Sequence, residues 1–266
     1  MLPSLLTTLF TITAQPGTDI WRKPPSTDVF NGKSKRKTTQ IMNIHTNNPK
    51  PLLSSQANTN TQPSLPPAPT SHAQTNPLSA FRSARVSFTG TWTHRYDQAG
   101  MALSLHRSTG TNCSSSSSSA SSSASAGPST PPKWVKTGIE YYQDQPRLST
   151  VTCDAWADWS VALPAAGTAG PGQADRPVVT LLARREADEL GTSLWVYQVV
   201  PAAAGNQGEE EVLLLPMREC AWAFAYEDDE DWMLTVAAYA ARPDKNTTET
   251  LEVAFQELNV EWAVTK

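Results

Sequence analysis

The chain has 266 residues and a formal net charge of −4, and charged residues make up 17% of it, below the ~25% that is usual in globular domains. A mildly acidic chain argues against nucleic acid as a general partner, and no run reaches the ~18 apolar residues of a membrane-spanning helix. The low charge comes from tracts of Ser, Thr, Asn and Pro. Without these tracts about 190 residues remain, enough for one domain with a hydrophobic core.

Three cysteines, Cys113, Cys153 and Cys220, occur without a CxxC motif. An odd count without a disulfide framework favours reduced thiols and a cytoplasmic protein. We expect Cys153 and Cys220 to be small buried apolar residues. The apolar start of the chain lacks a cationic segment and an A-x-A cleavage site, so Thr8 to Thr13 is interpreted as a first strand rather than as part of a signal peptide.

Two segments have compositions that are typical of disorder. Residues 32–75 contain the basic run KSKRK and are otherwise rich in Asn, Thr, Gln, Ser and Pro, so they bury too little apolar surface to offset their ordering entropy. Residues 110–131 form a Ser-rich loop that we also expect to be disordered. The predicted organisation is therefore an N-terminal strand with a Trp-Arg-Lys-Pro-Pro segment in 8–31, a disordered insert in 32–75 and a main domain in 76–266.

The rest of the chain is a succession of strand-like stretches. Alternating apolar and polar residues predict strands at 84–93, 96–105, 133–142, 148–153, 160–163, 177–184 and 193–200, on both sides of an acidic turn at 227–231, and at 251–262. Gly100 is a predicted β-bulge, residues 144–146 are a predicted turn, and only residues 184–190 hint at helical periodicity. About ten to thirteen strands predict an all-β fold, a two-sheet antiparallel sandwich, because each sheet has one apolar face to cover.

Residues 133–142 show the most informative alternation. Val135 and Ile139 belong to an apolar face, whereas Lys136 and Glu140 lie on the opposite face. A saccharide site needs flat aromatic faces for the C–H surfaces of the sugar and a few convergent polar groups. The candidate ligand-binding residues share this aromatic or polar character: Tyr96, Gln98, Trp134, Lys136, Glu140, Tyr142, Trp159, Arg22 and Arg218.

Each of these residues also has an ordinary structural interpretation. Any single Trp can be core packing, and Arg218 can form an ion pair with Glu219. Lys136 and Glu140 can be members of cross-strand charge pairs. These two residues are about 13 Å apart along one strand, so they converge only through a neighbouring strand.

The sequence offers little for catalysis or metal binding. A retaining glycoside hydrolase needs two carboxylates about 5–5.5 Å apart, and no E-x-D-x-E triplet occurs on a predicted strand. Asp154 and Asp158 have suitable spacing, but their Trp and Ala neighbours favour a turn. The acidic run at 227–231 lacks the D-x-D-x-D-G pattern of a calcium loop. We therefore expect no catalytic residues, no metal site and no cofactor.

Seven stretches together carry a resemblance to a known family. They are TDIWRKPPSTDVFN, WTHRYDQAG, WVKTGIEYYQ, LSTVTCDAWADWS, LWVYQVV, REC-W-F and AAYAARP. In this order they resemble the fungal branch of the DUF1349 family, which is known from the yeast "regulation of enolase" protein and from bacterial relatives. The resemblance covers residues 8–31 and roughly 80–263. It implies a jelly-roll sandwich similar to concanavalin A-like lectins and glucanases.

The resemblance also implies a function. The fold implies a concave sheet face that binds a saccharide, and the yeast member implies a protein-interaction role toward enolase. We therefore expect a non-catalytic, cytoplasmic, lectin-like protein that binds a carbohydrate, a sugar phosphate or a metabolic enzyme such as enolase. The alternatives are a diverged glycoside hydrolase or lyase on the same fold, and a purely structural interaction module.

The chain departs from the family pattern between Asn31 and Ala68, which the family joins directly as FN-AP. Residues 32–34 can be encoded with a GTAAGT splice donor, and residues 67–68 with a CAG acceptor. Residues 32–67 are therefore interpreted as a translated intron, with a lineage-specific disordered loop as the alternative. Transcript reads across this locus distinguish the two, because the intron interpretation requires spliced reads.

Overall fold

The computed structural model describes residues 10–32, 73–108, 131–165, 178–202, 211–229 and 231–264. Within these ranges the chain forms fourteen strands and one short 3-10 turn, Leu78–Ala80. The strands are β1 (Phe10–Ala14), β2 (Ile20–Lys23), β3 (Thr27–Phe30), β4 (Ala73–Pro77), β5 (Phe81–Gly90), β6 (Gln98–Arg107), β7 (Lys133–Tyr142), β8 (Gln145–Cys153), β9 (Ala157–Ala162), β10 (Val179–Asp188), β11 (Gly191–Pro201), β12 (Val212–Cys220), β13 (Trp232–Ala241) and β14 (Leu251–Trp262).

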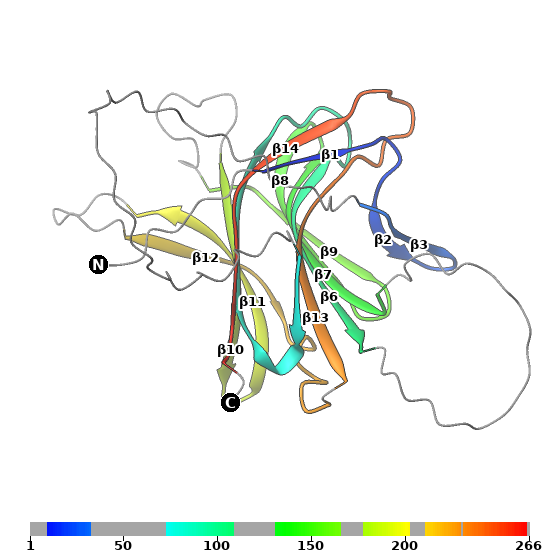
Figure 1. The fold of residues 1–266 in the computed structure, drawn as a ribbon. Coiled ribbons are helices and arrows are strands. Elements are labelled where there is room, and N and C mark those ends of the chain that lie inside the picture. The colour runs from blue at the N-terminus through cyan, green and yellow to red at the C-terminus, as the bar shows by residue number, and fades with distance from the viewer. Residues whose placement is uncertain are drawn as a thin grey trace, which may run out of the picture.

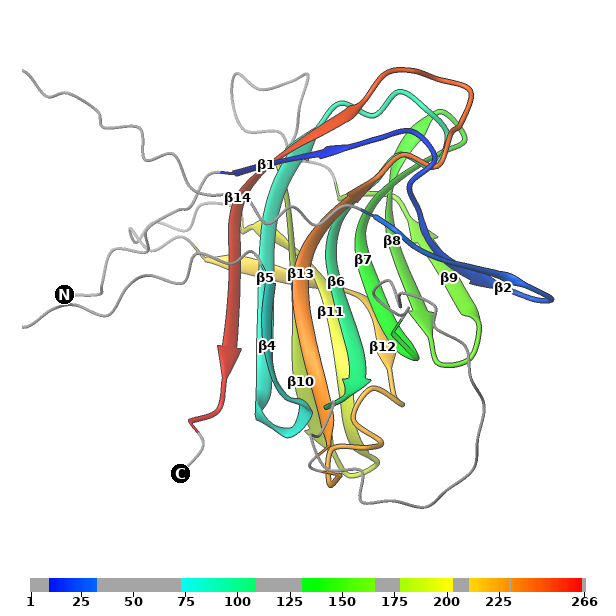
Figure 2. The same cartoon turned by 45° about the vertical axis from the view of Figure 1, so that its right-hand side comes forward.

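Two six-stranded antiparallel sheets pack face to face (Figures 1 and 2). The strand order is β1-β14-β5-β10-β11-β12 in the first sheet and β4-β13-β6-β7-β8-β9 in the second. The predicted all-β, two-sheet antiparallel sandwich is thus confirmed. It forms because the strands alternate, so that each sheet has one apolar face that only the other sheet covers.

Strand β7 shows how this alternation orients the second sheet. Val135 and Ile139 are buried in the main core between the sheets, whereas Lys136 and Glu140 lie on the face that points away from that core. The predicted division of β7 into an apolar and a polar face is therefore confirmed. What the alternation does not reveal is that the polar face is itself covered, since Lys136 and Glu140 are 1% and 5% exposed.

The cover is a small hairpin. Strands β2 and β3 pair only with each other and lie against the outer face of the second sheet, separate from both sheets in Figure 2. Ile20, Trp21 and Phe30 of this hairpin pack with Trp134 and Tyr239 of the sheet in a second, smaller apolar cluster. The hairpin therefore turns part of an exposed sheet face into a buried surface with a cavity at its border.

The predicted β-bulge at Gly100 is wrong. Gly100 pairs with Tyr239 on one side and Gly138 on the other without a shift of register. A Cβ atom on Gly138 would lie 1.8 Å from the carbonyl oxygen of Ala99, a distance that no side chain tolerates. The glycines are needed because β6 and β7 approach each other closely.

Two other local predictions also need correction. The turn predicted at 144–146 lies at Gln143 and Asp144, because Tyr142 already pairs with Gln145 and Pro146 belongs to β8. Both turn residues have positive φ, 53° and 57°, as a two-residue hairpin turn with the twist of its strands requires. Residues 184–190 are not helical, since β10 continues as a strand to Asp188.

The predicted segments and cysteines can be compared with the described part of the chain. β4 begins at Ala73, inside the range predicted as an insert, and pairs with β13. Residues 33–72 and 109–130, which hold most of the insert, most of the Ser-rich loop and Cys113, lie outside the described residues. Cys153 and Cys220 are free and buried, as predicted. Burial raises the pKa of both thiols, that of Cys220 to about 12.

Candidate functional site

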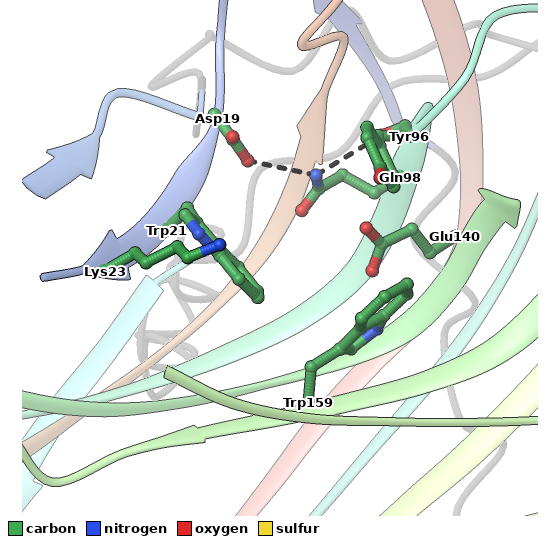
Figure 3. A pocket seen from close by; sticks show the side chains of 7 residues that line it. All are labelled: Asp19, Trp21, Lys23, Tyr96, Gln98, Glu140 and Trp159. Atoms are coloured by element: carbon green, nitrogen blue, oxygen red, sulfur yellow. Dashed lines mark hydrogen bonds between the residues drawn. The ribbon is translucent and has the colours of Figure 1, made fainter. Parts of the chain in front are cut away.

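A cavity of about 250 Å³ lies where the hairpin meets the second sheet. Asp19, Trp21 and Lys23 approach it from the hairpin side, and side chains from β6, β7, β9 and the loop before β6 face them (Figure 3). The residues that line the cavity are Asp19, Trp21, Lys23, Tyr96, Gln98, Glu140 and Trp159. Three aromatic rings and four polar or charged groups thus share one small space.

A chain of polar contacts forms the inner wall of this cavity. Gln98 stands directly opposite Glu140 across β6 and β7. Its amide nitrogen donates to Asp19 Oδ1 at 3.1 Å, and its amide oxygen accepts from Lys136 Nζ at 2.5 Å. Ser149 Oγ donates to Glu140 Oε2 at 2.9 Å. Lys136 and Glu140 therefore converge through the neighbouring strand β6, as the spacing along β7 requires.

Burial shifts the protonation of both charged groups on β7. Loss of solvation raises the pKa of Glu140, and the charge of Lys136 and the hydrogen bond from Ser149 oppose this shift only in part. Loss of solvation likewise lowers the pKa of the Lys136 amine, against the attraction of Glu140 and Asp19. Burial also raises the pKa of the Tyr239 phenol, on which the charges of Glu140 and Asp19 act in the same direction. Both members of an acid–base pair are thus moved toward their neutral forms.

Aromatic rings form the other wall. The rings of Tyr96 and Tyr142 stack at 5.8 Å with an interplanar angle of 11°. The indole of Trp159 meets the Tyr142 ring edge-on at 5.1 Å and the Trp21 ring edge-on at 6.3 Å. Trp159 is also held by its Nε1, which donates to Ser149 Oγ at 3.0 Å. These contacts fix the ring orientations before any ligand arrives.

A buried ion pair holds the loop that carries Tyr96. Arg242 donates from Nε and Nη2 to the two carboxylate oxygens of Asp97, each at 2.8 Å, and the side chains are 2% and 0% exposed. The backbone N–H groups of Tyr96 and Tyr141 donate to the carbonyl oxygens of Tyr141 and Asp97. Tyr96 is thereby kept at a φ of 68°, a conformation that a non-glycine residue adopts only when its surroundings impose it.

The structure places some of the nine candidate residues predicted from the sequence at the cavity and the others away from it. Tyr96, Gln98, Glu140 and Trp159 line the cavity, Lys136 lies behind Gln98, and Tyr142 stacks on Tyr96. Trp134 lies elsewhere. It is 1% exposed and packs under the hairpin beside Phe30, at 6.1 Å between ring centroids. It is a core residue, because the hairpin covers this part of the sheet.

The two arginines also lie outside the cavity. Arg22 points to the other side of β2, donating to the carbonyl oxygens of Pro131 and Pro132 at 2.9 and 2.8 Å and to Asp28 Oδ1 at 3.1 Å. It anchors the hairpin to the start of β7. Arg218 forms an ion pair with Asp158, not with the predicted partner Glu219, and so joins β12 to β9 at the edges of the two sheets.

Sequence reasoning missed three residues of the cavity, Asp19, Trp21 and Lys23. Asp19 directly precedes β2 and alternates with Trp21 and Lys23 of that strand, a period-two signal that the sequence does contain. Nothing in the sequence, however, says on which surface a two-stranded hairpin packs. Asp19 matters most, because it places a second carboxyl group in the cavity with Glu140. The search for a carboxylate pair along one strand could not find a pair that comes from two elements.

The described ranges hold neither a candidate metal cluster nor a candidate membrane-spanning helix. No group of three or more His, Cys, Asp and Glu side chains there is arranged to hold a metal ion. In the part of the chain that the structure describes, no helix is long and apolar enough to cross a membrane.

Comparison with known proteins identifies a relative that matches most of the chain. The sequence profile described as "Protein of unknown function (DUF1349)" matches residues 58–188. A protein from Emericella nidulans described as "Uncharacterized protein AN7484" is 34% identical over 236 residues, which cover 88% of this chain and 77% of that protein. A match of this length and identity establishes common ancestry along most of the chain.

Solved structures are more distant. A functionally unknown protein from Saccharomyces cerevisiae is 17% identical in sequence and superposes with a TM-score of 0.46. The match covers 97% of this chain and 89% of the yeast protein. The CBM2 module of the evolved Dit protein of Lactobacillus casei BL23 phage J-1 has a TM-score of 0.36, and the family 7 alginate lyase A1-II' one of 0.33. Each of these two is 9% identical and covers 71% of this chain and 67% of the other. All three scores lie below 0.5, so the fold assignment rests on the strand order of this chain itself.

Proposed function

Because this chain belongs to the DUF1349 family, whose function is unknown, we propose its function from the cavity itself: the cavity binds a neutral saccharide. The observation that carries the proposal is the convergence of three aromatic rings, Trp21, Tyr96 and Trp159, with the polar groups of Gln98 and Glu140. Flat apolar rings suit the C–H faces of a sugar, and a few fixed polar groups suit its hydroxyls.

The charges around the cavity favour a neutral ligand over a sugar phosphate. Asp19 and Glu140 are acidic, Lys23 is basic, and Lys136 is buried with a lowered pKa. The cavity carries charges of both signs, and among the described residues no arginine lines it. Phosphate recognition relies on converging cations or on bidentate arginines, and this wall supplies neither.

A glycan array followed by calorimetric titration tests the proposal. We expect the wild type to bind at least one neutral glycan and Trp159→Ala to weaken that binding by about thirtyfold, since truncating a central aromatic residue costs roughly 2 kcal/mol. Trp195→Ala is the matched control, because Trp195 stacks on Tyr197 in the other sheet. Failure of the wild type to bind any glycan, or equal losses in the two variants, would refute the proposal.

A second candidate function, cleavage of the bound saccharide, has a specific observation in its favour. Two carboxyl groups, Asp19 and Glu140, line the same cavity, and the pKa values of Glu140 and Lys136 are shifted toward neutrality. Shifted acid–base groups in a cavity are typical of catalytic sites. Incubation with polysaccharides, measuring new reducing ends and unsaturated products, tests this candidate. Glu140→Gln should abolish any release, and no release from any polysaccharide would leave only binding.

Enolase as a partner and the cytoplasmic location stay predictions, the first from the family resemblance and the second also from the cysteine count. Co-purification from cells with the Trp159→Ala variant beside the wild type tests the partner. Enolase recovered with neither protein would refute the interaction.

A further inference from the structure

A second hollow of about 250 Å³ lies beside the cavity, at the tip of the β7–β8 hairpin. Its lining residues come from the hairpin and from the loop before β6: Arg95, Tyr141, Tyr142, Gln143 and Asp144. None of them lines the first cavity. The proposed saccharide site therefore has a neighbouring hollow to which no role has yet been given.

The two hollows share a wall. Tyr96 lines the first and Tyr142 lines the second, and their rings are stacked face to face. Arg95 lines the second hollow, yet its Nη2 donates to the Tyr96 hydroxyl at 2.6 Å and its guanidinium lies 4.6 Å from the centre of the Tyr96 ring. The stacked tyrosine pair therefore lies between the first cavity and the second hollow.

The chemistry of the second hollow complements that of the first. It offers a guanidinium, a carboxylate and an amide from Arg95, Asp144 and Gln143, all of them exposed. Within the part of the chain that the structure describes, the side chains of Gln143 and Asp144 form no hydrogen bond with another side chain. They are therefore available to hydroxyl groups of a ligand, as donors and acceptors.

The backbone supports a role for both hollows. In the described ranges three non-glycine residues have a positive φ, namely Tyr96, Gln143 and Asp144, and each lines one of the two hollows. Residues in this conformation cost of order 1 kcal/mol or more and gather at ligand sites. A two-residue hairpin turn prefers Asn-Gly or Asp-Gly, so Gln143-Asp144 is not the sequence that turn formation alone favours.

Size adds a further argument. Sites that enclose drug-sized ligands hold roughly 300–1,000 Å³, and each hollow alone is smaller than this at about 250 Å³. Together they reach that range. The combined volume therefore suits a ligand that extends across both hollows better than either hollow alone does.

We propose that the site takes an oligosaccharide of at least two units, one against Trp159 and Tyr96 and the next beyond the tyrosine pair, hydrogen-bonded to Arg95 and Asp144. This inference rests on the proposed saccharide binding and adds chain length as a selected property. It follows that affinity depends on the number of units and not only on the kind of sugar.

Titration with mono-, di- and trisaccharides of glucose, N-acetylglucosamine, mannose and galactose tests the inference. For the sugar that binds, the disaccharide should bind at least about tenfold more tightly than the monosaccharide, the worth of one charge-assisted hydrogen bond. In Asp144→Gly, which suits the positive φ and so keeps the turn, and in Arg95→Ala, this ratio should fall toward one. Arg82→Ala, an exposed arginine outside both hollows, should keep the wild-type ratio.

The outcomes separate the two proposals. If mono- and disaccharides bind the wild type equally, or if both hollow variants keep the ratio, the extended site is refuted while saccharide binding stands. If none of the twelve sugars and no glycan on the array binds, saccharide binding fails and the extended site fails with it.

Discussion

The buried ion pair between Asp97 and Arg242 gives the sharpest prediction about stability. Asp97→Ala removes the acceptor of two hydrogen bonds that the Arg242 guanidinium donates, each 2.8 Å long. It also removes the acceptor of two hydrogen bonds from the backbone N–H groups of Thr93 and His94, which are 3.0 and 2.9 Å long. Arg242 is 2% exposed, so its charge is left buried without a countercharge, although its guanidinium still donates to the carbonyl oxygen of Glu249 and to Thr93 Oγ1. Breaking a buried pair from one side costs about 3–5 kcal/mol, a large share of the about 5–15 kcal/mol of a typical domain.

Urea denaturation followed by tryptophan fluorescence measures this loss, with the slope expected to stay unchanged. Asp28→Ala is the matched control, because Asp28 pairs with Arg22 at 3.1 Å and its side chain is 44% exposed. Removal of such a partly exposed partner costs about 0–1 kcal/mol. If Asp97→Ala loses no more unfolding free energy than Asp28→Ala, the Asp97–Arg242 ion pair does not hold the Tyr96 loop in place.

Three further predictions follow from the site and its supports. Burial raises the pKa of Glu140 above its ordinary 4.5, so the folded protein binds the proton of the Glu140 carboxyl group more tightly than the unfolded chain does. The wild type therefore loses stability as pH rises from 4.5 toward the raised pKa. Urea titrations across that window should show Glu140→Gln gaining unfolding free energy relative to the wild type, and a constant difference would contradict this. Gly138→Ala should lower the unfolding free energy by about 3 kcal/mol or more, because the new Cβ would lie 1.8 Å from the carbonyl oxygen of Ala99. An unchanged urea midpoint would disprove the close approach of β6 and β7 at this position. Iodoacetamide at neutral pH should leave Cys153 and Cys220 unlabelled in the folded protein and label them in urea. The reason is that burial raises the pKa of both thiols and only the thiolate reacts. Mass spectrometry of the labelled peptides checks this.

Part of the site could be predicted because strand periodicity assigns faces. Gln98, Lys136 and Glu140 are predicted as polar site residues, and the structure brings them together: Lys136 donates to Gln98, and Gln98 stands opposite Glu140 across β6 and β7. Tyr96 was selected for its aromatic ring alone. Its positive φ depends on Arg242, which lies 146 positions away in the sequence, so no local pattern announces it.

The sequence by itself determined the sandwich and the two faces of its strands, because side chains alternate along any extended chain and apolar faces must be covered. Only the tertiary structure decided where the β2–β3 hairpin packs. That placement buries Trp134, turns Arg22 away and adds Asp19 and Trp21 to the cavity. Periodicity tells which way a side chain points, whereas the surface it meets depends on contacts between residues more than a hundred positions apart.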